Sequence, residues 1–351
     1  MEPFVIATGT MHYAQNVLIR VHTSEGFYGV GECSAFPMIV GETQDTCLAM
    51  AKDFAKLWKD KDPLDIAARL NELDAFTAHN STIKSAFDMA LYDIASKAAN
   101  EPLYKYLGGS KRTIETEMTI GIGTPGEMAE QALKWQEQGV TVLKIKLGKN
   151  INDDLKRIRQ IRKAVKPEIQ IRIDANQGWS FDDAVIGLQS MENLNIEFCE
   201  QPMRTWYDDL LPELRQKSSV PIMADESCYN HHDARRLIKA GACDSINIKF
   251  AKSGGINEAR KIHDTAKEAG VPCMIGSMLE SRLALTANLH FAYASPNVQF
   301  FDLDTCMLGQ LEDPVLGGVF YQGFFLDLPD APGIGADVDD SFLSKSDHWK
   351  V

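Results

Sequence analysis

VLKIKLG, residues 142–148, is an apolar run with a charged side chain near its end, and this pattern decides the fold. Four later runs repeat it: IQIRIDANQG (169–178), NIEFCEQP (195–202), PIMADES (221–227) and SINIKF (245–250). A lone buried charge costs on the order of several kcal/mol unless it is paired or bound to a metal, so an ordinary core strand does not end this way. We therefore expect the charged strand ends to serve a common site.

The spacing of these charges indicates a repeated structural unit. The markers Lys146, Asp174, Glu200, Asp225 and Lys249 are separated by 28, 26, 25 and 24 residues. Helix-like segments such as INDDLKRIRQIRKAV (151–165) fill the intervals. One strand and one crossover helix need about this length, so the pattern predicts a repeated βα unit and a parallel sheet.

Eight strand candidates follow Thr113, with helical patterns between them, as at Pro125–Gln138 and Gly255–Ala269. The strands are Glu115–Ile120, Val142–Leu147, Ile169–Asp174, Asn195–Glu200, Pro221–Asp225, Ser245–Phe250, Pro272–Gly276 and Gln299–Leu303. Eight parallel strands with intervening helices predict an α/β fold, a closed (β/α)8 barrel of the TIM type, whose active site lies at the carboxyl ends of the strands. The charged residues stand at those ends.

Residues 1–108 have a different rhythm and are expected to form an α+β capping domain. NVLIRVHTSEGFYGVGEC (16–33) predicts an antiparallel hairpin, and helical patterns follow at Thr43–Trp58, Pro63–Leu73 and Ser81–Ala99. The loop Cys33–Glu42 is either a lid with exposed apolar residues or a plain connection. We assign the catalytic barrel to residues 109–310 and expect the Gly/Pro/Asp-rich segment 311–351 to pack back on the capping domain.

Composition and charge exclude several classes of protein. The 351 residues are 44% hydrophobic, enough for a large core in about two domains. A formal net charge of −13 argues against nucleic acid or an anionic membrane as partner. No stretch approaches the ~18 apolar residues of a membrane span, and no signal segment opens the chain. The seven cysteines are scattered without C-x-x-C spacing, so we expect a cytoplasmic protein without disulfides or zinc. We also expect a homo-oligomer.

The strand numbers also give a geometry. Lys146 closes strand two and Lys249 closes strand six, four positions apart in a ring of eight, so their ammonium groups should face each other across the mouth. Asp174, Glu200 and Asp225 close the three strands between them. Three converging carboxylates repel one another and need a cation, and all-oxygen ligation favours one Mg²⁺, with Mn²⁺ as a substitute. The alternative is that these carboxylates form salt bridges with lysines at the mouth.

Two bases on opposite sides of a metal indicate inversion at carbon. A carbon acid beside a carboxylate loses its proton only if the resulting enediolate is stabilised, which a divalent cation achieves. One lysine removes the proton from one face, and the other returns one to the opposite face. A lysine base needs a lowered pKa, for which the metal and Lys144, on the same strand face as Lys146, supply positive charge. Lys144 is placed either to neutralise a substrate carboxylate or to pair with the acidic residues.

The motifs as a set resemble a known family. They are K-I-K (144–146), D-A-N (174–176), E-Q-P (200–202), A-D-E-S (224–227) and N-I-K-F-A-K-S-G-G (247–255). This set resembles the enolase superfamily, specifically its muconate-lactonizing enzyme subgroup, over nearly the whole chain including the capping domain. The resemblance implies that Asp174, Glu200 and Asp225 are magnesium ligands and that Lys146 and Lys249 are the acid/base pair. The assignment from strand ends agrees with it.

The stretch FFDLDT (300–305) bears on the substrate, because several activities share this machinery. Asp302 and Asp304 are two apart, hence on one strand face, and suit a substrate ammonium group. This D-x-D is similar to the dipeptide epimerase motif that holds the N-terminal amine, although pairing with a mouth lysine is the alternative. By similarity, the remaining substrate contacts are Thr119, Ser277, Met278 and Leu279, with Glu280 a weaker member.

Two departures from the family pattern matter. In one branch, members that act on Ala-Glu carry an arginine in the first loop. The matching stretch here, IATGTMHYAQN (6–16), has no Arg or Lys, and Arg20 or another base is the remaining candidate. We therefore expect a dipeptide epimerase acting on Ala-Xaa with a small, apolar or uncharged Xaa, such as Ala-Ala or Ala-Val. The alternatives are an L-Ala-D/L-Glu epimerase, or an N-acylamino acid racemase or o-succinylbenzoate synthase of the same subgroup. Relatives usually have a further strand before Met1, so we expect a trimmed start or a shorter cap.

Other polar residues have plainer explanations. Lys252 is expected to begin the next loop rather than act as a base. Gly254-Gly255 opens a helix whose backbone amides suit an anion. His231 and His232 are expected to be capping or surface residues at a helix start. The two intact lysines disfavour a barrel that binds a ligand without catalysis.

Overall fold

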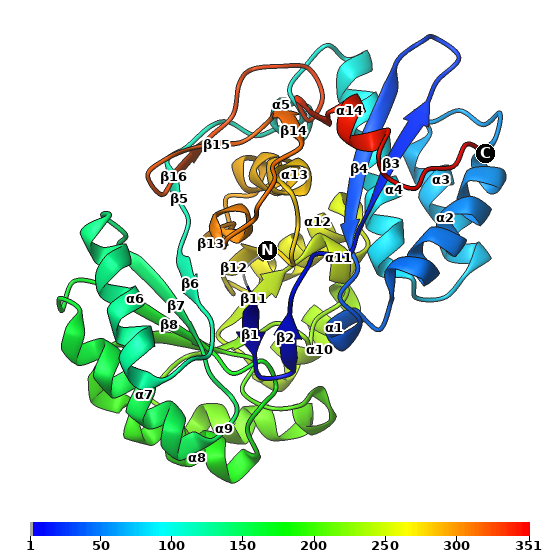
Figure 1. Ribbon diagram of the computed structural model, residues 1–351. Helices are drawn as coiled ribbons and strands as arrows, with labels where there is room; N and C mark the ends of the chain where they lie inside the picture. Colours follow the sequence, from blue (N-terminus) through cyan, green and yellow to red (C-terminus); the bar gives the residue numbers. More distant parts are fainter. Residues whose placement is uncertain (1–2) are drawn as a thin grey trace.

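The computed structural model describes residues 3–351 and shows a ring of strands and helices beside a smaller unit of helices and a hairpin (Figure 1). Eight parallel strands form one sheet in chain order. They are β6 (Met118–Ile120), β7 (Val142–Lys146), β8 (Gln170–Asp174), β9 (Ile196–Glu200), β10 (Ile222–Ala224), β11 (Ser245–Ile248), β12 (Cys273–Gly276) and β13 (Val298–Asp302). The predicted barrel is confirmed. At its seam, where β13 meets β6, the Glu117 amide donates to the Phe301 carbonyl at 3.2 Å.

The first predicted strand, Glu115–Ile120, is wrong in its extent because it contains two strands with different partners. β5 (Ile114–Glu115) pairs with β16 (Phe325–Asp327), and only β6 joins the barrel. Thr116 stands at the change of partner: its amide donates to the Phe324 carbonyl at 2.9 Å. Its hydroxyl accepts from the Leu303 amide at 2.9 Å. The chain therefore leaves the C-terminal sheet and enters the barrel within two residues.

Helices cover the outside of the barrel (Figure 1). They are α6 (Pro125–Glu137), α7 (Ile151–Ala164), α8 (Phe181–Ser190), α9 (Leu211–Lys217), α10 (His231–Ala240), α11 (Phe250–Ser253), α12 (Ile256–Glu268) and α13 (Arg282–Ala294), with 3-10 turns η1 (Glu192–Leu194), η2 (Thr205–Leu210) and η3 (Thr305–Met307). Strand alternation turns Ile145 toward these helices and leaves Lys144 and Lys146 facing the interior. The interior below the charged layer is filled by Phe198, Met223 and Met274.

The N-terminal unit follows its prediction closely. The hairpin β3 (Asn16–His22) and β4 (Tyr28–Ser34) is antiparallel, and it is followed by α2 (Gln44–Trp58), α3 (Ile66–Phe76), α4 (Ser81–Ala98) and α5 (Leu103–Tyr106). α3 begins three residues after the predicted Pro63, because the Asp65 side chain caps it by accepting from the Ala68 amide at 3.1 Å. β4 packs so closely on α4 that a Cβ at Gly31 would collide with the Ala86 carbonyl.

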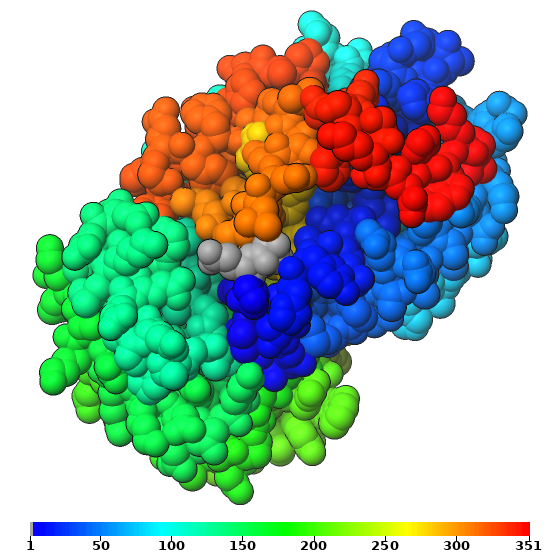
Figure 2. Space-filling view, in the orientation of Figure 1, coloured from blue at the N-terminus to red at the C-terminus, as the bar shows by residue number. Residues whose placement is uncertain are grey.

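A second small hairpin lies over the barrel mouth. β1 (Phe4–Ile6) and β2 (Gly9–Met11) pair with each other, and the Val5 carbonyl accepts from the Ile122 amide at 2.8 Å. With the short helix α1 (Pro37–Val40) they form an apolar cluster over the mouth. In Figure 2 this dark blue hairpin lies between the green half of the barrel and the rest of the blue unit. The region predicted as lid or connection therefore contributes to the cover of the barrel.

The C-terminal segment bridges the two units. β14 (Val315–Gly317) pairs with β17 (Ala336–Val338), and β15 (Phe320–Gln322) pairs with β16. Near the end, α14 (Asp340–Leu343) lies against the β3–β4 hairpin, where Arg20 pairs with Asp337 at 2.9 Å and Asp340 at 2.7 Å. Figure 2 shows this red segment lying across the blue unit. In residues 3–351 no helix is both long and apolar enough to cross a membrane.

Candidate active site

A cavity lies at the carboxyl ends of the barrel strands, beneath the β1–β2 hairpin and α1. Its walls combine polar residues from the strand ends with apolar residues from the cover. The lining residues are Phe4, Ile6, Met11, Phe36, Ile39, Thr119, Lys146, Asn176, Lys249, Ser277, Met278, Leu279, Asp302, Asp304, Thr305 and Leu308. The structure thus brings together both predicted acid/base lysines and every predicted substrate contact except Lys144 and the weaker candidate Glu280, neither of which lines the cavity.

The two lining lysines occupy different walls of the cavity. Lys146 ends β7, and Lys249 follows β11, so β8, β9 and β10 separate them around the barrel. Lys146 Nζ contacts Asp174 at 2.6 Å, while Lys249 Nζ contacts Asp225 at 2.8 Å. Because each ammonium is held by its own carboxylate, the amines point into the cavity from separate anchors.

The three predicted metal ligands are buried behind these lysines. Asp174 and Glu200 end β8 and β9, and Asp225 directly follows β10. Lys144 lies between the first two, with its Nζ 2.7 Å from Glu200 and 3.4 Å from Asp174. Within residues 3–351 no three Asp, Glu, His or Cys side chains converge as a ready set of metal ligands. The observed contacts are the lysine–carboxylate salt bridges of the alternative interpretation, and the assignment of these three carboxylates as metal ligands stays a prediction.

The lysines nevertheless do not fully offset the mutual repulsion of these buried carboxylates. Burial and the nearby Asp174 raise the pKa of Glu200 to about 8. Glu200 Oε2 and both Asp225 carboxylate oxygens lie 2.5–2.8 Å from lysine ammonium groups, but off the direction of a hydrogen bond. Buried carboxylate oxygens without directed donors are the ligands that Mg²⁺ takes in proteins. The donor chemistry therefore fits the predicted cation.

The carboxylates around Lys249 oppose the lowered pKa that we expect of a lysine base. Burial alone would lower its pKa, but Asp225 and Glu200 outweigh burial and raise the pKa above the ordinary lysine value. The same happens at Lys144, where Asp302 and Glu200 raise the pKa. The argument for a lowered pKa counts positive neighbours, whereas the observed contacts are the lysine–carboxylate pairs of the salt-bridge alternative.

Asp302 and Asp304 both line the cavity but differ in their partners. Asp302 Oδ2 contacts Lys144 Nζ at 2.8 Å, as the pairing alternative expected. Asp304 lies beyond the strand in a helical conformation, so strand alternation does not place it. Its Oδ2 accepts from the Thr119 amide at 2.6 Å, and its Oδ1 has no hydrogen-bond partner among the described residues. Burial, followed by Asp302, raises the pKa of Asp304 well above its usual range.

Lys144 is placed behind the cavity wall. Its side chain is fully buried, and its ammonium contacts acidic side chains of β8, β9 and β13. A residue in this position orients Asp302 and Glu200 and has no open path to a ligand. The other predicted substrate contacts, including Ser277, Met278 and Leu279 after β12, remain on the wall.

Sequence reasoning missed two asparagines at the site. The Asn247 side chain donates to Glu200 Oε1 at 2.8 Å. Asn176 lines the cavity and donates to Glu226 at 3.4 Å. Burial and Asp225 raise the pKa of Glu226 to about 7. Both asparagines stand in the quoted strand-end motifs, D-A-N and N-I-K, and this position is the signal that would have identified them.

The expectation for Lys252 was wrong in its location. Lys252 lies in α11 and is 1% exposed. Its ammonium group contacts residues at the ends of several strands. It contacts the Asp225 carboxylate at 2.5 Å and the Asn247 and Cys228 carbonyls at 3.0 and 3.1 Å. It contacts Asp225 Oδ1, whereas Lys249 contacts Oδ2 of the same carboxylate. Its spacing of one helical turn from Lys249 is the signal that sequence reasoning passed over.

The apolar cover contributes no basic group to the cavity. Phe4, Ile6, Met11, Phe36 and Ile39 are its lining residues. In the described part of the chain, the lining cations are the two lysines at the strand ends. Arg20, the remaining candidate partner for an acidic side chain, is held by Asp337 and Asp340 of the C-terminal segment.

Comparison with known proteins places this geometry among related chains. Residues 1–108 match the mandelate racemase / muconate lactonizing enzyme N-terminal domain, and residues 127–342 match the enolase C-terminal domain-like model. The chain is 43% identical to a D-Ala-D/L-Ala epimerase from Cytophaga hutchinsonii, over 98% of this chain and 94% of that one. It is 37% identical to an L-Ala-D/L-Glu epimerase from Clostridium acetobutylicum, over 96% and 94%.

A solved structure shows the same likeness. The dipeptide epimerase from Cytophaga hutchinsonii, complexed with Mg and the dipeptide D-Ala-L-Val, superposes with a TM-score of 0.96 at 42% identity. The superposition covers 98% of this chain and 94% of that chain. The capping unit and the barrel are therefore shared together, not the barrel alone.

Proposed function

The chain belongs to the mandelate racemase / muconate lactonizing enzyme family, and we propose that within it this isomerase is a dipeptide epimerase. The reaction inverts the α-carbon of the C-terminal residue of a dipeptide by 1,1-proton transfer. The observation that carries the proposal is that one cavity has Lys146 and Lys249 on separate walls. The same cavity is also lined by Asp302 and Asp304. The epimerase relatives support the same reaction class.

Asp174, Glu200 and Asp225 are the residues that would hold Mg²⁺, with Mn²⁺ as a substitute. Their buried oxygens support this assignment, as does the Mg complex of the Cytophaga hutchinsonii relative. When bound, the ion supplies positive charge next to the substrate carboxylate, which lowers the cost of removing the α-proton. It also competes with the lysines for these carboxylates, which favours the free-amine form of Lys249.

The proton steps belong to the two lysines. For one epimer, the Lys249 amine takes the α-proton, so a C–H bond breaks and an N–H bond forms. The Lys146 ammonium then gives a proton to the opposite face of the same carbon, and the opposite epimer runs in reverse. Separate anchors on Asp174 and Asp225 keep the two amines apart, as inversion requires.

The acidic pair of strand eight would bind the substrate ammonium. Asp304 has an oxygen without a hydrogen-bond donor, so a substrate N–H⁺ would supply the missing partner. Lys144 holds Asp302 in place from behind, and Thr119 holds Asp304 through its amide. N-acylated substrates lack this cation, which disfavours an N-acylamino acid racemase and an o-succinylbenzoate synthase.

The apolar cover supports a preference for a small, apolar or uncharged second residue, as in Ala-Ala or Ala-Val. A glutamate side chain would enter a cavity whose cover, within residues 3–351, carries no basic group, and burying that carboxylate unpaired is costly. The runner-up is an L-Ala-D/L-Glu epimerase, the activity of the Clostridium acetobutylicum relative.

The test follows α-deuterium incorporation into dipeptides in heavy water with Mg²⁺. We expect exchange and epimerisation of Ala-Ala and Ala-Val, and much slower turnover of Ala-Glu. Lys146→Ala and Lys249→Ala serve as controls: each should abolish epimerisation yet keep exchange from one epimer. A strong preference for Ala-Glu would overturn the specificity. Absence of exchange from every dipeptide would overturn the function.

We also propose that the enzyme works in the cytoplasm. All seven cysteines are unpaired, and all except Cys306 are buried. Unpaired cysteines of this number suit a reducing compartment. Fractionation of the source cells, with the dipeptide activity as marker, tests the assignment.

A further inference from the structure

The turn that carries Lys249 is held from outside the barrel by a helix of the capping unit. Helix α4 faces the segment from α11 to the start of α12. The Asp88 carboxylate on α4 accepts from the Ile256 amide at 2.6 Å and the Asn257 amide at 3.2 Å. One helical turn or more earlier on α4, the Thr82 hydroxyl donates to the Ala251 carbonyl at 3.2 Å. The capping unit therefore binds this segment at two points.

Between these two contact points lie Lys252 and Ser253, which hydrogen-bond to the backbone of Lys249. The Lys249 carbonyl accepts from the Lys252 and Ser253 amides, both at 3.0 Å, and from the Ser253 hydroxyl at 3.2 Å. The Gly254 amide returns to the Phe250 carbonyl at 2.8 Å. Residues 249–255 thus form one hydrogen-bonded turn, and a shift at either of its ends moves the whole turn.

The fit between Asp88 and this turn allows no added atom. Gly255 has φ = 113°, which L side chains rarely adopt, and a Cβ there would collide with the Asp88 carboxylate. The backbone amides that the sequence suggested for an anion are therefore occupied by an anion of the protein itself. Gly255 is required by this contact, since only glycine lets the carboxylate reach the helix start.

Asp88 is a costly way to cap a helix if stability is its purpose. It is fully buried, and among residues 3–351 it forms no ion pair. Burial raises the pKa of Asp88 to about 8, so the protein works against the charge of this group. An uncharged Asn or Ser caps a helix as well as Asp does and avoids that cost. A carboxylate accepts hydrogen bonds from two backbone amides at once, so we expect Asp88 to fix the turn more rigidly than Asn or Ser would.

We propose that Asp88, assisted by Thr82, is a positioning residue that sets the Lys249 amine against one face of the substrate. The inference rests on the two-lysine reaction proposed above. Lys146 is fixed independently, at the end of β7 by Asp174. Loosening the α4 contact therefore impairs proton transfer on the Lys249 face and spares transfer on the Lys146 face.

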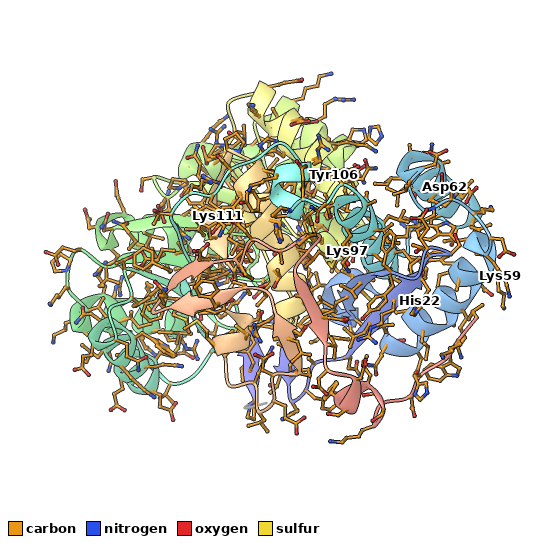
Figure 3. All side chains as sticks on the ribbon, turned by 90° about the horizontal axis from the view of Figure 1, so that it is seen from above. His22, Lys59, Asp62, Lys97, Tyr106 and Lys111 are labelled. Carbon is orange, nitrogen blue, oxygen red and sulfur yellow. The ribbon has the colours of Figure 1, made fainter. Side chains whose placement is uncertain are left out.

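Asp93 offers a matched control on the same helix. It is also a buried carboxylate, and it accepts from the Val30 amide at 2.9 Å and the Ile334 amide at 2.7 Å. It pairs with Lys97 at 2.6 Å. In the view from above, Lys97 lies on the barrel side of the capping unit, whereas Lys59 and Asp62 lie at its outer edge (Figure 3). The contacts of Asp93 hold the hairpin and the C-terminal segment, so its loss tests general loosening.

The experiment compares Asp88→Asn, Thr82→Val and Asp93→Asn, each assayed well below its Tm. The rate of α-deuterium incorporation is measured separately from the two epimers of Ala-Ala, with Mg²⁺ present. Lys249→Ala identifies which epimer depends on Lys249. Amide hydrogen exchange across residues 249–257 is measured on the same variants, because it reports the turn directly and requires no catalysis.

For Asp88→Asn we expect at least about a tenfold loss of exchange from the Lys249-dependent epimer, since misplacement by ~1 Å costs up to about 100-fold. The other epimer should keep its rate within about twofold of wild type. Thr82→Val should show the same asymmetry in milder form. Amide exchange at 249–257 should rise in both variants and not in Asp93→Asn.

Equal losses from both epimers, or the same asymmetry in Asp93→Asn, would overturn the positioning role. Unchanged amide protection at 249–257 in Asp88→Asn would do so without reference to activity. If the wild-type chain exchanges neither epimer of any dipeptide, the proposed function itself fails, and the positioning role falls with it. If the Asp88→Asn variant then still shows faster amide exchange at 249–257, the contact between Asp88 and the turn is real and only the proposed reaction is wrong.

Discussion

Removing the charge of Asp304 should separate binding of the substrate ammonium from every other role of the site. In Asp304→Asn the side chain keeps its size and can still accept from the Thr119 amide, the contact that holds Asp304 at 2.6 Å. What disappears is the carboxyl oxygen Oδ1, which has no donor in the described chain and which a substrate ammonium group would favour in its charged form. We expect the loss to concern free dipeptides and to spare substrates without an ammonium group.

The magnitude follows from one charged hydrogen bond in a dry site. Such a bond contributes about 1.5–3 kcal/mol, which corresponds to a fall of about 10- to 100-fold in kcat/KM. Most of the change should appear in KM, because the ammonium is bound alike in the ground state and the transition state. For N-acetyl-Ala-Ala, which wild type should already use poorly, the substitution should add less than about a twofold change.

The stability of the free protein should move in the opposite direction. The folded-state pKa of Asp304 is raised from its usual 3.8 by burial, so its favourable contribution is complete at low pH and is lost as pH rises through the folded pKa. Asparagine never ionises and avoids this loss. At neutral pH we therefore expect Asp304→Asn to have a Tm equal to or above that of wild type.

Glu280→Gln is the matched control for this experiment. Glu280 is another buried carboxylate, its pKa is raised to about 8 by burial and by Glu32, and Asn288 donates to it at 3.2 Å. It does not line the cavity. The assay is kcat/KM for free and N-acetylated Ala-Ala in the three proteins. Equal losses for both substrates in Asp304→Asn, or a selective loss in Glu280→Gln, would refute the assignment.

Three further predictions address other parts of the structure. Buried His290 accepts from the Tyr104 amide at 3.0 Å and has its pKa lowered to about 4 by burial. The free energy of unfolding should therefore fall by about 3 kcal/mol as pH drops from 6.5 to 4. Urea titrations at several pH values should show a smaller fall in His290→Gln. Mg²⁺ at ~100 times its Kd should stabilise the protein by about 2.7 kcal/mol, seen as a higher Tm that chelation reverses and that Glu200→Gln lacks. Glu32 accepts from the Ser281 amide and hydroxyl at 2.8 and 2.6 Å and so holds the loop after β12. Glu32→Gln should loosen this loop and raise KM for Ala-Ala severalfold, with kcat nearly unchanged. A fall in kcat alone would contradict this prediction.

The barrel was predictable because its signal is local. Alternation along VLKIK fixes which side chains face the interior, and the repeat of about 25 residues orders the strands. Lys146 and Lys249 could therefore be placed on separate walls from strand numbers alone. The same reasoning placed Asp174, Glu200 and Asp225 on the strands between them.

Contacts between the two units were not predictable in this way. Asp88 meets Ile256 across 168 residues of sequence, and Glu32 meets Ser281 across 249. No periodicity reports such pairs, because they depend on how α4 and β4 dock against the barrel. The pKa of Lys249 is hidden from the sequence for a related reason: strand position shows which charges are near, but the ion-pair distances decide which of them dominates.

Two parts of the capping unit differ in what a substitution there should do: the β1–β2 hairpin with α1, and helix α4. The lysines and the acidic residues of the cavity come from the barrel, while the hairpin β1–β2 and α1 contribute only apolar groups to it. Changes in that cover reshape the space for the second residue without moving either amine. α4 differs, because its contacts hold the turn of Lys249. We therefore expect changes at Met11 or Phe36 to alter substrate preference at constant kcat. Changes along α4 should instead alter the rate for one epimer first.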